Sequence, residues 1–296
     1  MLVRLGTRGS ELALAQSMQV ARQLESLHPG LRVETLVIKT TGDQKADVPL
    51  SSLGGKGAFT REIEHALLGG QVDLAVHSLK DLPTTLPEGL VLGAVPERQD
   101  PRDCLIASVP LGELPPGARV GTGSARRVGQ LRQARPDLIF EGIRGNLPTR
   151  VAKWRRGEYQ AIVLALAGLN RLGLEACGLE PHELHPLDPS VCLPAPGQGV
   201  LGLEIREHDE QTRALLAPLE HPESALAMRV ERAFLAELEG NCSLPAGCLA
   251  ESGREGLSAR GVLGDAGGER LARSSAHDRD PERLGRELAR QLKAQL

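Results

Sequence analysis

The chain has 296 residues, of which 41% are apolar and 25% are charged, and its formal net charge is −3 at pH 7. These values are those of an ordinary globular protein, so they exclude a disordered tail, a collagen-like fibre and a strongly basic nucleic-acid coat. Aromatic residues make up only 2% of the chain. Because few rings are present to stack on bases, we expect no nucleic-acid partner.

Strand-like and helix-like segments alternate over residues 1–98. The pattern predicts strands at 2–5, 32–38, 72–76 and 90–95, and helices at 11–27 and 60–68, the first capped by Ser10. Such alternation predicts a mainly parallel sheet with helices on both faces. The turn-rich stretch 96–101 indicates a crossing into a second domain.

The same alternation restarts after that crossing. Strands are predicted at 119–121, 138–140 and 161–165, and helices at 125–134 and 147–156. A second stretch rich in Pro and Gly, 193–199, leads into a strand at 200–205, which we interpret as returning to the first domain. A helix at 224–238, short strands at 257–263 and 269–275, and a final helix at 281–296 predict a small α+β unit.

Basic residues are concentrated between 119 and 156, where ten cations and two acids give a local charge of +8. Such an excess attracts anions, although scattered arginines are more often part of a solvated helix face. Three glycine-containing loops, 6–10, 121–127 and 142–146, each lie between a predicted strand and a predicted helix. Helix N-termini bind anions. No phosphate-binding fingerprint is present, so a polycarboxylate fits the loops.

Two further residues are candidates for chemistry. Asp81 follows an apolar strand and lies among cations, so it could stabilise a developing positive charge. The alternative is that Asp81 caps the turn before Pro83. Cys242 lies in a loop rich in Gly and Pro, where it is either an inert thiol or one that reacts with a strongly electrophilic partner. His77 fits a structural histidine better than a general base.

Export, membrane and metal-binding signals are weak or missing. The first residues lack the pattern of a signal peptide, and no window approaches a membrane span. The five cysteines contain no C-x-x-C pair, so we expect reduced thiols, a cytoplasmic protein and no membrane partner. Cys177, His182, His185 and Cys192 match no zinc-finger spacing, so we expect no metal.

Taken together, the motifs resemble the porphobilinogen deaminase family. The resemblance runs over nearly the whole chain, through TRGS (7–10), GGKG (54–57), AVHSLKDLP (75–83), DPRD (100–103), GTGSARR (121–127), RGN (144–146), AGLNRLGLE (167–175), LPAPGQG (193–199) and the Cys242 loop. It implies an α/β fold of two periplasmic-binding-protein-like (type II) domains with a central cleft, plus a small C-terminal α+β domain. The implied boundaries are 1–98 with 195–217, 99–194, and 218–296.

The resemblance also implies an activity in tetrapyrrole, porphyrin and heme biosynthesis. Four porphobilinogen units lose ammonia and join head to tail to give hydroxymethylbilane, on a dipyrromethane cofactor bound through a thioether to Cys242. We expect a monomeric transferase with porphobilinogen as its partner. The chief alternative is a solute-binding protein, which would have no use for the loop thiol.

Site residues are implied position by position. Asp81 matches the catalytic aspartate and also contacts the cofactor. The other matching cofactor positions are Ser78, Lys80, Thr122, Ser124, Arg126, Arg127 and Arg144. The matching substrate positions are Arg8, Ser10, Lys56, Phe59, Arg144, Arg150, Arg171 and Gln198. Ser52 stands where the family often has a lysine, which puts one contact of that loop in doubt.

Overall fold

The computed structural model describes residues 1–44, 57, 59–238, 245–265 and 270–296. The chain divides into two compact units. Unit 1 comprises residues 1–98 and 200–225, and unit 2 comprises residues 99–199 and 226–296. The division into three domains expected from the sequence stays a prediction.

Unit 1 is built on a five-stranded sheet in the order β2-β1-β3-β10-β4. Its strands are β1 (Leu2–Thr7), β2 (Arg32–Val37), β3 (Leu74–Ser78), β4 (Leu90–Ala94) and β10 (Leu201–Arg206). Strand β1 runs parallel to β2 and β3, whereas β10 runs antiparallel to β3 and β4. The segment at 200–205 therefore returns to the first sheet as expected, but the sheet is mixed rather than mainly parallel.

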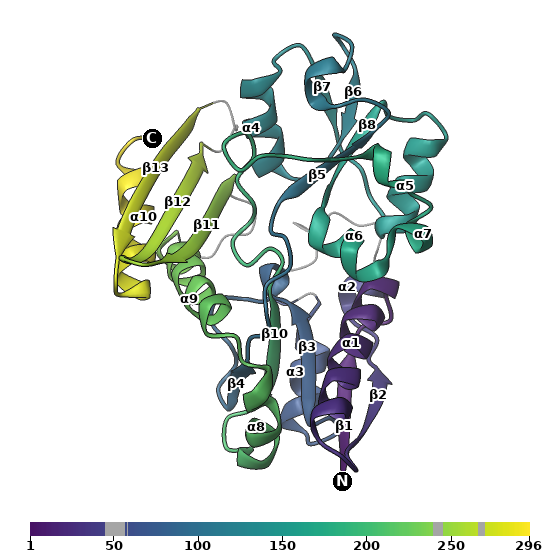
Figure 1. Cartoon of the computed structure of the whole chain (residues 1–296), viewed down its shortest axis with the longest axis vertical. Coiled ribbons are helices and arrows are strands. Elements are labelled where there is room, and N and C mark those ends of the chain that lie inside the picture. Colours follow the sequence, from purple (N-terminus) through teal and green to yellow (C-terminus); the bar gives the residue numbers. More distant parts are fainter. Residues whose placement is uncertain (45–56, 58, 239–244, 266–269) are drawn as a thin grey trace. The chain divides into compact units, whose positions relative to one another are not determined.

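Helices cover both faces of this sheet (Figure 1). Unit 1 contains α1 (Glu11–Leu27), α2 (Thr41–Gln44), α3 (Arg61–Leu68) and α8 (Glu210–Leu216), with short 3-10 helices at Leu79–Asp81 and Ala217–Leu219. Apolar side chains of α1 and α8 share one buried cluster with β1, β3 and β10. Helix α3 packs into a separate cluster with Ala75 and Leu90.

The first sheet of unit 2 repeats the plan of unit 1, in the order β7-β6-β8-β5-β9. Its elements are β5 (Asp103–Ala107), β6 (Arg119–Gly121), α4 (Ala125–Ala134), β7 (Ile139–Glu141), α5 (Leu147–Arg155), β8 (Ala161–Ala165), α6 (Leu166–Leu172), α7 (Leu174–Cys177) and β9 (Leu184–Pro186), with 3-10 helices at Leu111–Glu113 and Pro181–Glu183. Strand β5 runs antiparallel to β8 and β9, and β6 runs parallel to β7 and β8.

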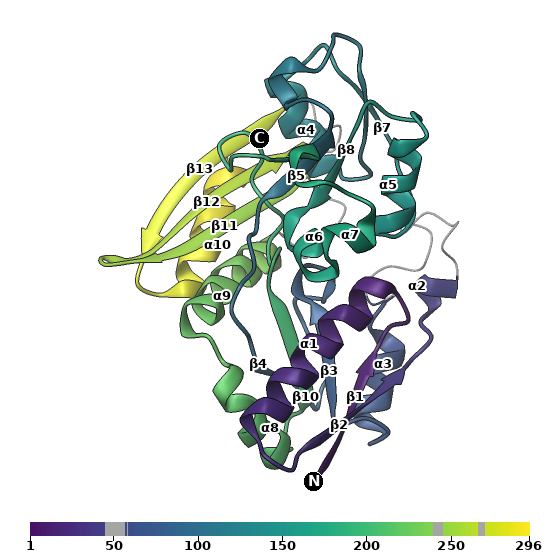
Figure 2. The same cartoon turned by 45° about the vertical axis from the view of Figure 1, so that its right-hand side comes forward.

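The C-terminal part of unit 2 is a three-stranded antiparallel sheet in the order β11-β12-β13. It consists of α9 (Pro222–Glu237, whose first turn belongs to unit 1), β11 (Ala246–Gly253), β12 (Gly256–Gly264), β13 (Leu271–Asp278) and α10 (Pro281–Lys293). Figure 2 shows α10 lying along the strands. Helices α9 and α10 cross closely because residue 285 is glycine: a Cβ there would lie 2.2 Å from the Val230 carbonyl oxygen.

The fold class expected from the sequence is confirmed. Two α/β sheets share one plan, and a small α+β domain follows them. Several elements were not anticipated, among them β5, β9, β11 and α6 to α8. No helix in the described part of the chain is long and apolar enough to cross a membrane.

Candidate functional site

In unit 1, the predicted site residues gather where β1 and β3 end. The two strands are parallel, so their carboxyl ends share one edge of the sheet. Ser10 follows β1 and caps α1, because its Oγ accepts a hydrogen bond of 3.3 Å from the Ala13 N–H. The Gln16 side chain of α1 donates a 2.9 Å hydrogen bond to Ser78 Oγ at the end of β3. This bond ties α1, the helix that Ser10 caps, to the end of β3.

The same edge of unit 1 carries charged and aromatic groups. The Arg8 guanidinium lies over the Phe59 ring, 4.1 Å from its centroid. Such a contact holds a planar cation against an apolar face while its edge can still pair with a carboxylate. Lys80 is half-buried in the 3-10 helix that follows β3. Lys56 lies outside the described residues, so its assignment stays a prediction.

Asp81 ends that 3-10 helix and its side chain is exposed. Among the described residues, none forms a hydrogen bond or ion pair with its carboxylate. The bond that closes the helix runs instead from the Leu82 N–H to the Leu79 carbonyl oxygen, at 3.1 Å. Asp81 therefore does not cap the turn before Pro83, and its oxygens can accept hydrogen bonds from a ligand.

His77 is occupied by a buried partner. Its Nε2 lies 2.9 Å from Glu204 Oε2, and the two residues are 6% and 0% exposed. Burial raises the pKa of the neighbouring Glu64, with a further contribution from Glu204. A histidine held in this way fits the structural interpretation better than that of a general base.

In unit 2, the residues that follow β6 form the N-terminus of α4. Ser124 caps this helix by accepting a 3.4 Å hydrogen bond from the Arg127 N–H. Thr122 Oγ1 accepts a 3.3 Å hydrogen bond from the Ser124 N–H. Both hydroxyls therefore stabilise the loop itself, and they lie where helix N–H groups attract an anion.

The guanidinium groups of Arg126 and Arg127 are buried on Asp103, which is 0% exposed. Arg126 Nη1 lies 2.7 Å from Asp103 Oδ2, and Arg127 Nη2 lies 2.7 Å from Asp103 Oδ1. Gln198 Nε2 donates a further hydrogen bond of 2.8 Å to Oδ1. Burial by itself would raise the pKa of Asp103, but the two guanidiniums outweigh it and hold that pKa far below its usual range. One carboxylate thus orders both arginines and the glutamine.

The loop before α5 depends on glycine. Gly145 has a φ of +114°, and a Cβ there would lie 2.6 Å from the Thr149 side chain. Asn146 Oδ1 caps α5 by accepting a 2.9 Å hydrogen bond from the Thr149 N–H, and Arg150 Nε donates a 2.7 Å hydrogen bond to the Gly145 carbonyl oxygen. Arg144 itself is exposed, so its guanidinium is accessible to an anion.

Arg171, in α6, has an incomplete set of partners. Its Nη2 donates a 2.7 Å hydrogen bond to the Gly199 carbonyl oxygen, but its buried Nε has no hydrogen-bond partner in the described structure. Burial lowers the pKa of Arg171 to about 10, so the group is still a cation at neutral pH. A buried donor without an acceptor is costly, and a ligand carboxylate would supply that acceptor.

The cysteines separate into two cases. Cys242 lies outside the described residues, so its covalent role stays a prediction. Cys248 is 0% exposed within the core of the C-terminal domain, and Cys104 and Cys192 are also buried. Within the described ranges, no group of three or more His, Cys, Asp or Glu residues could hold a metal ion.

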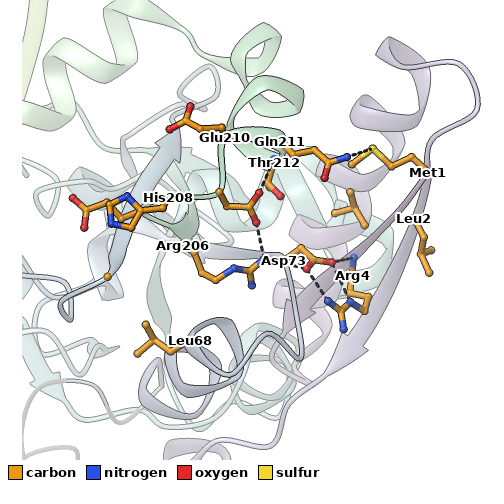
Figure 3. Close-up of a pocket in the computed structure, with 14 residues that line it drawn as sticks. Met1, Leu2, Arg4, Leu68, Asp73, Arg206, His208, Glu210, Gln211 and Thr212 are labelled. Atoms are coloured by element: carbon orange, nitrogen blue, oxygen red, sulfur yellow. Dashed lines mark hydrogen bonds and ion pairs between the residues drawn. The ribbon is translucent and has the colours of Figure 1, made fainter.

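Unit 1 also has a pocket of about 860 Å³, at the opposite edge of its sheet (Figure 3). Arg4 and Asp73, at the beginnings of β1 and β3, pair at 2.8 Å. Arg206 pairs with Asp73 and Asp209, at 3.2 and 2.6 Å. These charges are satisfied by one another, and none of the predicted site residues lines the pocket.

Comparison with known proteins decides the family. The model described as "Porphobilinogen deaminase, dipyromethane cofactor binding domain" matches residues 3–214, and that of the "Porphobilinogen deaminase, C-terminal domain" matches residues 225–294. The chain belongs to the porphobilinogen deaminase family. The family and the dipyrromethane cofactor expected from the motifs are thereby confirmed.

Curated relatives agree over almost the full chain. Porphobilinogen deaminase of Syntrophobacter fumaroxidans is 46% identical and covers 98% of this chain and 94% of its own. Those of Moorella thermoacetica and a Roseiflexus species are each 48% identical and cover 99% and 97% of this chain, and 93% and 94% of their own. Among solved structures, the aliphatic sulphonate binding protein of Escherichia coli matches with a TM-score of 0.38 and 15% identity, over 81% of this chain and 71% of that one.

Among the described residues, three fully buried acids lie outside those assigned to the site of this porphobilinogen deaminase-family chain. They are Asp103, Glu204 and Glu231, each 0% exposed. Asp103 appears within the DPRD motif, but the motif gave it no role. A signal was present, because each acid adjoins apolar residues inside a strand or helix. A lone acid in such a position is buried only when it is well partnered.

Proposed function

We propose that this chain is a hydroxymethylbilane synthase, which joins four porphobilinogen units head to tail with loss of ammonia. The double family match over residues 3–214 and 225–294 carries the proposal. When bound, the dipyrromethane supplies the pyrrole to which new rings are joined. The remaining argument concerns what the chain's own residues do.

The donor set suits a ligand with many carboxylates. The buried Nε of Arg171 has no acceptor in the described structure, and Arg144 presents an exposed guanidinium. Each pyrrole unit carries acetate and propionate groups, and guanidinium forks bind carboxylates in pairs of hydrogen bonds. These residues therefore fit the cofactor and its substrate.

We assign the binding residues on this basis. The cofactor is held by a thioether to Cys242 and by Ser78, Lys80, Asp81, Thr122, Ser124, Arg126, Arg127 and Arg144. The substrate is bound by Arg8, Ser10, Lys56, Phe59, Arg144, Arg150, Arg171 and Gln198. Because Asp103 already orients Arg126 and Arg127, these two guanidinium groups are preorganised before any ligand binds.

Asp81 is the residue that we assign to the chemistry. Its exposed carboxylate has no partner within the described residues, so its oxygens can accept hydrogen bonds from pyrrole N–H groups. A fixed negative group close to a ring nitrogen stabilises the positive charge that develops there as ammonia leaves. The same stabilisation applies when the next ring attacks.

We further propose that the protein acts in the cytoplasm as a monomer. The described cysteines form no disulfide with one another and are buried, as expected of thiols in a reducing compartment. The excess of positive charge over residues 119–156 is neutralised in part by internal ion pairs such as that of Arg126 with Asp103.

Intact mass spectrometry tests the proposal. The wild-type chain should carry an added mass of two linked pyrrole units and should convert porphobilinogen to hydroxymethylbilane. Cys242→Ser should lack both the added mass and the activity, whereas Cys248→Ser should keep the added mass because that thiol is buried. An unmodified wild-type chain, or an equal adduct on Cys242→Ser, would contradict the assignment.

A further inference from the structure

Glu231 is a buried carboxylate that joins two separate backbone segments of unit 2. It belongs to α9, a helix that lies beside β11 (Figure 1), and is 0% exposed. Its Oε2 accepts a 2.6 Å hydrogen bond from the Gly197 N–H, and its Oε1 accepts a 2.9 Å hydrogen bond from the Ala250 N–H. One side chain therefore ties the 193–199 segment to strand β11.

The two segments are also packed closely against each other. The Cys248 N–H donates a 3.1 Å hydrogen bond to the Pro194 carbonyl oxygen. A Cβ at residue 247 would lie 3.0 Å from the carbonyl oxygens of both Leu193 and Pro194, so glycine is needed there for the approach. Strand β11 is the strand that follows Cys242 in the sequence.

The 193–199 segment continues the connection toward the buried arginines. Gln198 directly follows Gly197, the residue whose N–H bonds to Glu231. The Gln198 side chain donates 2.8 Å hydrogen bonds to the Pro101 carbonyl oxygen and to Asp103 Oδ1. Asp103 in turn binds Arg126 and Arg127. A continuous series of short polar contacts thus runs from β11 to the arginine pair, all within unit 2.

An acid is required at this point for a geometric reason. A carboxylate has two acceptor oxygens and can receive both N–H groups at once. Glutamine has one acceptor oxygen, and its NH₂ would face the second donor. Burying a charged group is expensive, so a helix that needed only apolar packing would carry a Leu or Met here.

We propose that Glu231 is a positioning residue for the cofactor. It keeps the strand after Cys242 in a fixed place relative to the turn that orients Gln198 and, through Asp103, the two arginines. This inference rests on the proposed function, since it assumes that Cys242 carries the dipyrromethane and that the arginines bind its carboxylates.

The test compares Glu231→Gln with a matched control, Glu183→Gln. Glu183 is also buried in unit 2, accepts a 2.9 Å hydrogen bond from a backbone N–H and pairs with Arg155, but it takes no part in the series. Circular dichroism first establishes that both variants are folded. The rate at which each apo-protein gains the cofactor mass on incubation with porphobilinogen is then measured, together with kcat and KM.

Small misplacements of reacting groups lower rates strongly, so Glu231→Gln should gain the mass about tenfold more slowly and lose about tenfold in kcat, with KM within about twofold of wild type. Glu183→Gln should stay within about twofold of wild type in all three. Glu231→Gln rates within about twofold of wild type, or equal losses in both variants, overturn the inference. A wild-type chain that gains no mass instead overturns the proposed function.

A double-mutant cycle with Gln198→Ala tests whether Glu231 acts on the arginines through the 193–199 segment and Gln198. If Glu231 acts through the turn, Glu231→Gln should cost about tenfold in the wild-type background but less than about twofold in the Gln198→Ala background. Independent, multiplicative losses would overturn the route. Should Glu231→Gln fail to fold, Glu231→Asp replaces it with the same expectations, because its shorter carboxylate cannot reach both N–H groups.

Discussion

Replacing Asp103 with asparagine should destabilise the protein severely. The Asp103 carboxylate is 0% exposed and receives Arg126 Nη1 at 2.7 Å, Arg127 Nε and Nη2 at 3.1 and 2.7 Å, and Gln198 Nε2 at 2.8 Å. In Asp103→Asn, one oxygen becomes an NH₂ that faces these donors, and two buried cations lose their counter-ion. Removing one partner of a buried ion pair costs about 3–5 kcal/mol. That is a large share of the 5–15 kcal/mol or so that typically stabilises a native protein.

Urea denaturation at pH 7 measures this loss in the free energy of unfolding. The matched control is Asp137→Asn, which breaks the surface pair between Asp137 and Arg135 and should change stability little, because exposed pairs contribute little. If Asp103→Asn lost less than about 1 kcal/mol, the view of Asp103 as the centre of this buried network would be refuted.

The pH dependence of stability should also distinguish Asp103→Asn from the wild-type protein. The folded-state pKa of Asp103 is far below its value of about 3.9 in an unfolded chain. Its stabilisation is therefore complete above about pH 4, and it is lost as the pH falls toward the folded-state pKa. Relative to wild type, Asp103→Asn should show a shallower loss of stability below about pH 4, which acid titration followed by circular dichroism would measure.

Three further changes have distinct expected results. Asp81→Asn should lower kcat about 100-fold or more with an unchanged melting temperature, since the carboxylate is exposed; retained turnover would exclude its role. Arg171→Met should raise KM for porphobilinogen yet alter the unfolding free energy by no more than about 1 kcal/mol, because one hydrogen bond and one unsatisfied donor are removed together; a loss above about 2 kcal/mol in urea would contradict this. Burial raises the pKa of Cys104 and Cys192 to about 12, so iodoacetamide at pH 8 should modify them only in urea, and rapid labelling of the native protein would disprove their burial.

Elements with a strong local pattern could be predicted from the sequence, and elements formed by pairing could not. Helix α1 was recognisable from its apolar spacing and from Ser10, which does cap it. Strand β11 (Ala246–Gly253) is rich in Ala and Gly and has little intrinsic strand preference; it forms because it pairs with β12 along its whole length. The sequence also held no sign that β10 runs antiparallel to its neighbours, since direction depends on the route by which the chain returns to the sheet.

The sequence offered candidate positions for the site, which stay predictions, and it could not show which contacts those residues make. Loops between strands and helices marked Ser10 and Ser124 as candidates, and in the structure both side chains are helix caps. The family resemblance and their place in a glycine-containing loop predict that Arg126 and Arg127 bind the ligand. Sequence spacing could not show that Asp103, 23 residues before Arg126, buries both of them. Long-range partners of this kind are set by the packing of strands, which local patterns do not specify.

The residues assigned to the site differ in how far the chain completes their interactions. Asp103 and neighbouring carbonyl groups accept hydrogen bonds from Arg126, Arg127 and Gln198. These three side chains are therefore already oriented within the folded chain. Arg171 keeps a buried Nε–H without an acceptor, and Asp81 has an exposed carboxylate with no partner in the described structure. The buried Nε–H of Arg171 is a cost to the fold that a ligand acceptor would remove, and the exposed Asp81 carboxylate is accessible to a ligand donor. An anionic pyrrole chain is suited to both, because its carboxylates would accept from Arg171 and its ring N–H groups would donate to Asp81.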